Sequence, residues 1–474
     1  TALFMAVLNV SSAFADSWVM PTPAASALKP GSKYYVYNVG TKKFISKGEA
    51  WGTQAIVDSL GMEAKLDTLS NGIYSIAFTS TGKMVFRTNS DTKIGSGIAA
   101  CFTDGNIGKG ANHVYWSIKN IGNNLYTIQV PAIYTSDYVA GKCLGVQPNH
   151  TSSAATPTYG TYYDVDSTTY ASGCQWQFVS SADYNTYFTS VQVYAEAQLL
   201  SREITKAQTD GLDITKAQAV YNNTLSTIDE MKAAIAELYQ QRANQASVSN
   251  PSDMTGRITN PTFDKDITGW TSTMNAKSNK IATNQAGDFT VPFFENWTTE
   301  GSSLEGKMYQ KIGGLQNGVY RLKAAVSAQN TKTAMADGGV YLFGNDMRIG
   351  ANTVTPAYKE VFVPLTTDTL EIGLMQNATS TNNWLGLDNV TLTYYGKALE
   401  AYQYMTSSIT DTWQTESTDV VYKQSLYDVI PNLISAASTT TNAEDAITAY
   451  KNVNTAIESL RANIIAYTQF INKI

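Results

Sequence analysis

Histidine, cysteine and charged side chains are scarce in this chain of 474 residues. Its two histidines, His113 and His150, are too few for a multi-histidine zinc site or for most histidine-based proton relays. Charged residues make up 15%, against about 25% in an average soluble domain. The net charge is −6, and the sequence contains no block of basic residues. A surface that follows nucleic-acid phosphates needs such a block, so nucleic acid is not expected as a partner.

Motifs that carry hydrolytic or phosphoryl-transfer chemistry are missing as well. The chain contains no Gly-x-Ser-x-Gly elbow, Walker loop, His-Glu-x-x-His or Cys-x-x-Cys. Its carboxylates form no pattern typical of a glycosidase, which needs two of them on either side of a cleft. We therefore predict that the chain is not an enzyme.

Long apolar runs are confined to the first fifteen residues, TALFMAVLNVSSAFA. Ala13 and Ala15 form an A-x-A cleavage pattern, so residues 1–15 are predicted to be the remnant of a secretory signal peptide. The stretch is shorter than the roughly 20 residues that span a bilayer, and no transmembrane segment is expected in the mature chain. We expect a bacterial protein that is secreted, on the cell surface or in the periplasm.

The three cysteines, Cys101, Cys143 and Cys174, leave two possibilities open. An exported protein can oxidise a pair, and Cys143 and Cys174 lie in the same predicted domain. The sequence does not say whether their Cβ atoms face each other, so three small buried thiols are the alternative.

Residues 16–181 alternate short β-type runs with Gly, Asn, Asp and Ser turns, which is typical of an all-β domain. A threefold repeat runs through them. Residues 116–126 can be laid over residues 64–74, and third copies of the strand start and of the Trp position occur at Tyr35 and Trp176. Three units that cannot each bury a face alone can close a barrel together.

This segment resembles a ricin-B-type β-trefoil, a fold commonly used for carbohydrate binding. Two positions depart from that family. Gly145 stands where the lectins have a sugar-binding Asp, and Cys174 stands where their Gln-x-Trp motif has Gln before Trp176. The resemblance therefore implies the fold but not the sugar site of the third repeat. Trp51 is a candidate stacking residue, with core or turn packing as the alternative.

Residues 182–248 change to helical periodicity and predict a three-helix bundle. The expected helices cover residues 183–208 and 213–222 and a third stretch that begins at a Thr-x-x-Glu capping box, Thr227 to Glu230. We assign this module a spacer role.

Residues 249–396 return to alternation and predict a β-sandwich of about eight or nine strands. Tyr320 and Leu322 illustrate the pattern, with Arg321 between them. The opening motif Asn260-Pro-Thr-Phe-Asp with Gly269-Trp270, and the closing motif Trp384-Leu-Gly-Leu-Asp-Asn-Val, resemble galactose-binding-like jelly rolls. Such domains serve as carbohydrate-binding modules in bacterial glycan-degrading systems.

Candidate sugar-binding residues cluster in this sandwich. A pyranose offers an apolar C–H face for stacking on an aromatic ring and hydroxyls that need amide or carboxylate partners. Glu295, Asn296 and Trp297 follow Phe293-Phe294 and are expected in a loop at one edge, and Asn383-Trp384 is the second candidate. Trp270 is expected in the core.

The jelly-roll resemblance also implies a structural calcium ion that joins the first and last strands. Asp264 and Asp388 match the acidic positions of the two motifs, and carboxylate oxygens are ligands suited to Ca²⁺. A solvated turn Asp and a capping Asp are the alternatives.

Residues 397–474 are predicted to form a second helical bundle. Thr441-Asn-Ala-Glu444 is a capping box. An apolar seam follows it at heptad spacing, comprising Tyr450, Val453, Ile457, Leu460, Ile464, Tyr467, Ile471 and Ile474.

These observations favour a secreted, non-catalytic protein of four modules that binds carbohydrate. Its role would be to hold polysaccharide or host glycan near the bacterial surface or a partner enzyme. Two alternatives stay open: the accessory front of a larger glycoside hydrolase or peptidase that continues past residue 474, and a structural adhesin that binds protein.

Overall fold

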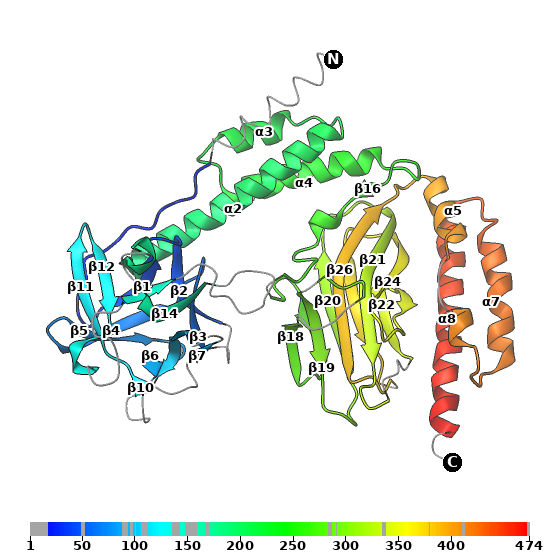
Figure 1. The fold of residues 1–474 in the computed structure, drawn as a ribbon. Coiled ribbons are helices and arrows are strands. Elements are labelled where there is room, and N and C mark those ends of the chain that lie inside the picture. The colour runs from blue at the N-terminus through cyan, green and yellow to red at the C-terminus, as the bar shows by residue number, and fades with distance from the viewer. Residues whose placement is uncertain are drawn as a thin grey trace. The chain divides into compact units, whose positions relative to one another are not determined.

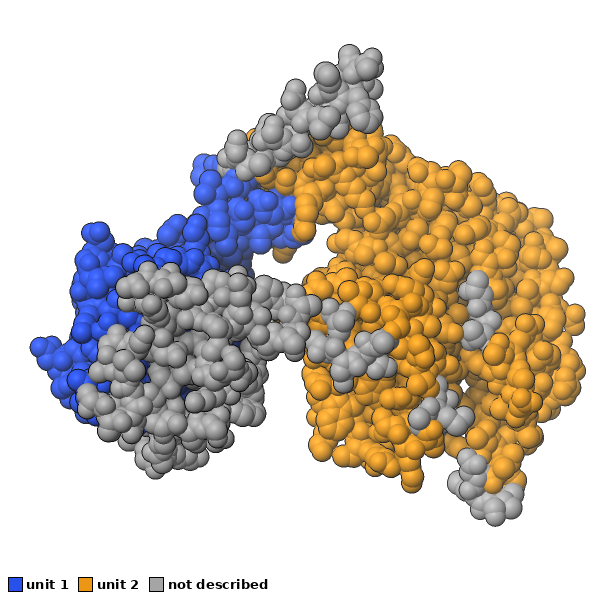
Figure 2. All heavy atoms as spheres, in the orientation of Figure 1, with its two compact units in different colours: residues 1–199, 224–228 blue, residues 200–223, 229–474 orange. Residues whose placement is uncertain are grey.

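The computed structural model describes residues 18–48, 53–87, 93–94, 98–99, 101–105, 112–134, 143–146, 159–165, 171–264, 266–282, 287–290, 292–333, 338–378, 380–409 and 413–471. The predicted signal remnant, Trp51 and His150 lie outside these residues. The chain divides into two compact units, residues 1–199 with 224–228 and residues 200–223 with 229–474 (Figure 2). Every helix in the described part of the chain is too short or too polar to cross a membrane.

Six strands of the first unit form a closed antiparallel ring (Figure 1). In ring order they are β1 (Lys33–Asn38), β4 (Glu63–Ser70), β5 (Ile73–Phe78), β11 (Trp116–Gly122), β12 (Leu125–Gln129) and β15 (Trp176–Ser180), which returns to β1. Because the ring is closed, each of these strands pairs with a neighbour on both sides over at least part of its length.

Three strand pairs extend from this ring, each attached to one ring strand. They are β2 (Lys43–Gly48) with β3 (Gln54–Asp58), β6 (Lys83–Arg87) with β9 (Phe102–Gly105), and β13 (Cys143–Val146) with β14 (Tyr159–Val165). The short strands β7 (Lys93–Ile94), β8 (Ile98–Ala99) and β10 (Asn112–His113) complete the unit.

The ring repeats three times in its register. The cross-strand pairs Tyr34–Ala64, Tyr74–Trp116 and Tyr126–Trp176 occupy equivalent places. The predicted overlay of residues 116–126 on 64–74 is thus confirmed, but the third Tyr is Tyr34, not Tyr35. Tyr34 is buried at 3% exposure and shares the barrel core with the two Trp rings.

Two of the repeats each contain an equivalent hydrogen bond from a Trp side chain to a backbone carbonyl. Trp116 Nε1 donates to the carbonyl of Met84 (3.1 Å), and Trp176 Nε1 donates to the carbonyl of Leu144 (2.9 Å). Both donors stand 32 residues after their acceptors. The first repeat has Ala64 at this position and cannot make the bond.

The three cysteines are buried thiols, and no disulfide links them. Of the two possibilities that the sequence left open for Cys143 and Cys174, the structure has the reduced one. Gln129 Nε2 donates to Cys143 Sγ (3.6 Å), which ties this thiol to strand β12.

The three predicted helical stretches are present as α2 (Ser181–Thr209), α3 (Thr215–Asn222) and α4 (Ile228–Gln245). In the first unit, the start of α2 packs on the ring, where Tyr184 stacks on Tyr35 with centroids 3.5 Å apart. In the second unit, Arg242 of α4 pairs with Glu203 of α2 (2.6 Å) and with Asp210, which directly follows α2 (2.8 Å). Because Arg242 is only 4% exposed, loss of these carboxylate partners would leave a buried cation without compensation.

Two antiparallel sheets of the second unit face each other across one core. The six-stranded sheet has the order β18 (Ser278–Ala282), β19 (Phe293–Trp297), β26 (Trp384–Tyr394), β21 (Gly318–Gln329) and β24 (Ala357–Leu365), with β16 (Ser252–Asp253) paired to β26. The five-stranded sheet has the order β17 (Thr271–Ser272), β20 (Gly306–Ile312), β25 (Leu370–Gln376), β22 (Val340–Gly344) and β23 (Met347–Gly350). Tyr320 and Leu322 are buried and Arg321 is half-buried, as the alternation predicts.

The loop predicted for residues 293–297 is wrong, because they form strand β19 between β18 and β26. Its two faces are both largely buried: Phe294 joins the sandwich core, while Phe293 joins an aromatic cluster on the outer face. The Pro292 break that suggested a loop directly precedes the strand, and Glu295 and Asn296 are polar residues of a strand that is covered on both sides.

The chain ends in four helices, α5 (Leu399–Ser407), α6 (Trp413–Glu416), α7 (Gln424–Ala437) and α8 (Ala443–Ile471). The predicted cap is displaced by one residue: Asn442 Oδ1 accepts from Asp445 N (2.8 Å), and Asp445 accepts in return from Asn442 Nδ2. The seam of α8 is buried through Leu460 but Tyr467 and Ile471 are 40% and 50% exposed, so only its first part is core.

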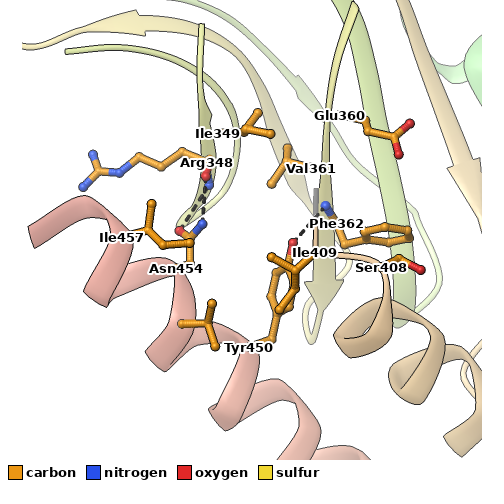
Figure 3. Close-up of a pocket in the computed structure, with 11 residues that line it drawn as sticks. Arg348, Ile349, Glu360, Val361, Phe362, Ser408, Ile409, Tyr450, Asn454 and Ile457 are labelled. Carbon is orange, nitrogen blue, oxygen red and sulfur yellow. Dashed lines mark hydrogen bonds between the residues drawn. The ribbon is translucent and has the colours of Figure 1, made fainter. Parts of the chain in front are cut away.

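Helix α8 is fastened to the sandwich by polar contacts (Figure 3). The side chain of Asn454 bonds both backbone groups of Arg348, and the Tyr450 hydroxyl accepts from Phe362 N (3.3 Å). The hollow between these residues is about 20 Å³. Such a space holds little more than one water molecule, so it is no ligand site.

Candidate functional site

The outer face of the six-stranded sheet, which points away from the shared core, carries three of the six predicted sugar-binding residues, Glu295, Trp297 and Trp384. Trp297 of β19 lies opposite Trp384 of β26, which lies opposite Gln329 of β21. The neighbouring row on the same face runs from Lys280 through Glu295 and Gly386 to Ser327. The pairing of strands thus brings together the two Trp motifs, which are far apart in sequence.

Four of the aromatic rings on this face pack on one another. Phe289, Phe293 and Trp384 form a buried cluster, and the half-buried ring of Trp297 packs against it. Phe289 stacks on Phe293 with centroids 4.5 Å apart, and Phe293 meets Trp384 edge to face at 6.4 Å. Trp297 is the member of this cluster that keeps appreciable contact with solvent.

Glu295 is a fixed and nearly buried carboxylate in the centre of this group, with 5% of the residue exposed. One of its oxygens accepts from Trp384 Nε1 (2.8 Å), and the other pairs with Lys280 Nζ (3.3 Å). The first bond fixes the orientation of the Trp384 indole, and the lysine compensates the buried charge.

The middle of the face is closed by the loop at residues 287–290. A Cβ on Gly386 would lie 2.6 Å from the Phe289 ring, so only glycine lets this ring lie on the sheet. Thr290 N donates to Asp388 Oδ2 (2.7 Å), and Asn389 Nδ2 donates to Thr290 Oγ1 (2.9 Å). These bonds hold the loop down, so the aromatic cluster is accessible at the end that carries Trp297, while the exposed ring of Tyr358 lies on the same face on strand β24.

The other predicted ligand residues are buried and engaged within the protein. Asn296 points to the core side of β19, is 0% exposed and contacts Asn279 through its amide. The Asn383 amide accepts from Thr331 N (2.8 Å) and donates to the Thr298 carbonyl (3.2 Å). Direct ligand roles for these residues, and for Trp51, stay predictions.

The two motifs at the ends of the sandwich meet in space. The carbonyl of Pro261 accepts from Val390 N (2.9 Å), beside the positive φ of Asn389 (51°). Trp270 is in the core as predicted, with 6% exposure, and its Nε1 donates to the carbonyls of Thr259 and Asn260.

Asp388 is fully buried, and its Oδ1 has no hydrogen-bond partner among the described residues. Burial raises the pKa of Asp388 to about 7, backbone donors at Thr290 and Asn389 oppose the shift, and the charge of exposed Asp264 adds to it. A cation near this orphan oxygen would remove the cost of its burial. In the described part of the chain, however, no three His, Cys, Asp or Glu side chains are grouped to hold a metal ion.

Three features of this face were not predicted from the sequence: the Phe289 loop, the glycine at position 386 on which its ring lies, and the lysines Lys280 of β18 and Lys277 in the turn before it. They become neighbours of Trp297 and Trp384 only through strand register. No local motif indicates such register across 90 residues, so nothing in the sequence pattern could have found them.

No protein-family model matches the chain, and no curated protein is significantly similar to it. Among solved structures, the carbohydrate-binding module TmCBM61 in complex with β-1,4-galactotriose is 16% identical and matches 29% of this chain and 97% of its own length (TM-score 0.24). The CBM22-1 xylan-binding domain of Paenibacillus barcinonensis Xyn10C is 13% identical over 29% and 93% (TM-score 0.22).

A third similar structure is the Macrolepiota procera ricin B-like lectin in complex with lactose, 10% identical over 33% of this chain and 99% of its own (TM-score 0.23). The similar structures are thus mainly carbohydrate-binding modules and lectins, with some enzymes among them. At these TM-scores the likenesses transfer no activity to this chain.

Proposed function

We propose that this chain is a non-catalytic carbohydrate-binding protein and that its ligand stacks on Trp297. The observation that carries the proposal is the half-exposed indole of Trp297 beside the Glu295–Trp384 hydrogen bond. An aromatic ring that is held by neighbouring hydrogen-bonded side chains suits stacking of the apolar C–H face of a pyranose. Glu295 acts through Trp384, because both of its oxygens already have partners.

The closed centre of the face limits what can bind. Since Phe289 lies over Gly386, a glycan that stacks on Trp297 is confined among the described residues to the end of the sheet at Trp297 and Gln329. This arrangement favours a short segment or a chain end over a long stretch that crosses the whole sheet. We assign residues 249–396 to the galactose-binding-like jelly rolls because of the two facing antiparallel sheets and the two end motifs.

We assign residues 16–181 to the ricin-B-type β-trefoils. The closed six-stranded ring, its three attached strand pairs and the threefold Tyr register support this fold. Gly145 is buried and offers no carboxylate, so the sugar site of the third repeat is not carried over with the fold.

A structural calcium ion at Asp388 and Asp264 belongs to the same proposal. The orphan oxygen of Asp388 is the observation that supports it, and backbone carbonyls and water would have to complete the six to eight ligands that Ca²⁺ takes. The ion would supply structural stability, with no part in any reaction.

The setting that fits such a protein is outside the cytoplasm of a bacterium, where the chain would hold polysaccharide or host glycan near the cell surface or a partner enzyme. A glycan array probed with the intact chain tests the function, together with a turnover assay on a broad panel of glycans, esters and peptides. We expect binding without turnover. An array without signal, or turnover that a point change in this chain abolishes, would overturn the proposal.

A further inference from the structure

Lys277, the lysine next to Trp297, pairs with no carboxylate in the part of the chain that the structure describes. Lys277 is exposed, its backbone N–H donates to the Trp297 carbonyl (3.0 Å), and its Nζ lies 5.5 Å from the centroid of the Trp297 ring. No carboxylate of the described residues lies within ion-pair distance of this ammonium group. A cation that pairs with no carboxylate of the described residues therefore lies over the one ring of the Phe289–Phe293–Trp384–Trp297 cluster that solvent reaches appreciably.

A second lysine lies in the adjacent row of the same face. The Lys280 side chain is 53% exposed and pairs with Glu295, whose own side chain is 7% exposed. Lys280 thus cancels the charge of a carboxylate that the ligand cannot reach, and it presents its ammonium group to solvent. Two lysines against one glutamate leave this corner with a charge of +1, on a chain whose net charge is −6.

A neutral pyranose would gain little from this arrangement, because stacking on Trp297 competes with the ammonium group that already covers the ring. A sugar that carries an anionic group could stack and pair with that ammonium group together. The amides of Asn296 and Asn383 are buried, so the lysine ammonium groups are the accessible polar groups next to Trp297 among the described residues.

We propose that Lys277 and Lys280 make the Trp297 site selective for glycans that carry an anionic substituent, a carboxylate or a sulfate. The inference rests on the proposed function and names the ligand class of the same site. Lys277 makes the direct contact, and Lys280 both compensates Glu295 and adds to the local potential.

The test compares the binding of three related glycans: neutral galactan, polygalacturonate and a sulfated galactan. For any other sugar that the array identifies, its neutral form is compared with its acidic form. Affinities of the intact chain are measured by titration calorimetry at low and high salt. The variants are Lys277→Gln and Lys280→Gln, with Lys232→Gln on exposed α4 as a control that removes the same charge elsewhere.

The acidic glycan is expected to bind more tightly than its neutral partner, and more weakly as salt rises. Lys277→Gln should weaken acidic binding about tenfold, the worth of a charge-assisted contact, and should not weaken neutral binding, because it removes the ammonium group that competes with stacking. Melting curves check that Lys280→Gln, which strands the Glu295 charge, is still folded. Preference between carboxylate and sulfate identifies the source of the negative charge.

Equal or tighter binding of neutral glycans, or acidic binding that survives both lysine changes, would overturn the inference while the proposed function stands. Absence of binding to every glycan would instead refute the proposed function. An effect of Lys232→Gln equal to that of Lys277→Gln would mean that general charge, and not this site, decides the preference, and would also overturn the inference.

Discussion

Replacement of Asp388 by Asn should remove a pH dependence from the stability of the sandwich. The folded carboxyl has a pKa of about 7, against 3.8 for an ordinary Asp, because it is buried. Between about pH 4 and pH 7 the folded protein therefore keeps a proton that the unfolded chain has lost. With a raised carboxyl pKa, stability is greatest below the unfolded value and falls as the pH rises through this window.

A difference of about three pKa units corresponds to roughly 4 kcal/mol at most, which the wild type loses by pH 8 without metal. Asp388→Asn keeps the acceptor for Thr290 N and has no charge, so its stability relative to wild type should rise from about pH 4 and level off above pH 7. The measurement is scanning calorimetry of both intact proteins in chelator across pH 4–8, read from the transition of the second unit.

Calcium adds a second arm to the same assay. If Ca²⁺ binds Asp388, added calcium should raise the melting temperature of the wild type at pH 8 and leave Asp388→Asn unchanged, because the ion compensates a charge that the variant lacks. A difference between the two proteins that does not vary from pH 4 to pH 8 would refute the buried-carboxyl reasoning. If the melting temperature of the wild type does not respond to chelator or to calcium, the proposed calcium site is refuted.

Three further changes test the packing, each by chemical denaturation of the intact chain. Arg461→Ala should cost about 3–5 kcal/mol, because it removes the buried cation that pairs with half-buried Glu416 (2.6 Å) and buried Glu458 (3.1 Å), and a loss under 1 kcal/mol would contradict this. Trp176→Phe should cost about 1–3 kcal/mol in the first unit by leaving the Leu144 carbonyl without its donor, and a normal midpoint would argue against that bond. Asn442→Ala should cost about 1 kcal/mol, whereas the same change at Thr441 should cost little; the reverse order would restore the cap predicted from sequence.

The repeat in the first unit could be predicted because it is carried by large side chains at fixed spacing. Trp116 and Tyr126 stand in the same relation as Ala64 and Tyr74, and cross-strand pairing preserves that spacing. The error of one residue at Tyr35 arose where successive tyrosines alternate between the two faces of β1, because spacing alone does not say which face is the core.

The candidate site could be predicted only in part. Trp297 and Trp384 were found as residue types, yet their contact depends on β19 pairing with β26, which is a long-range register. Burial of Asn296 could not be foreseen, since an amide in a strand covered on both faces looks the same in sequence as an amide in a loop. Lys277 was missed for the same reason, because it lies beside Trp297 only through the pairing of β18 with β19.

The affinity of Trp297→Ala for the glycan that binds the intact chain, measured together with its melting curve, tests the central claim most directly. If the half-buried ring is the stacking platform, truncation should cost about 2 kcal/mol or more of binding, which is at least about tenfold in affinity. The melting temperature should change little, because much of the ring's surroundings is solvent and lysine rather than core. Unchanged affinity would contradict the account, as would a loss of about 3–5 kcal/mol of stability, which is the cost of removing a core aromatic ring.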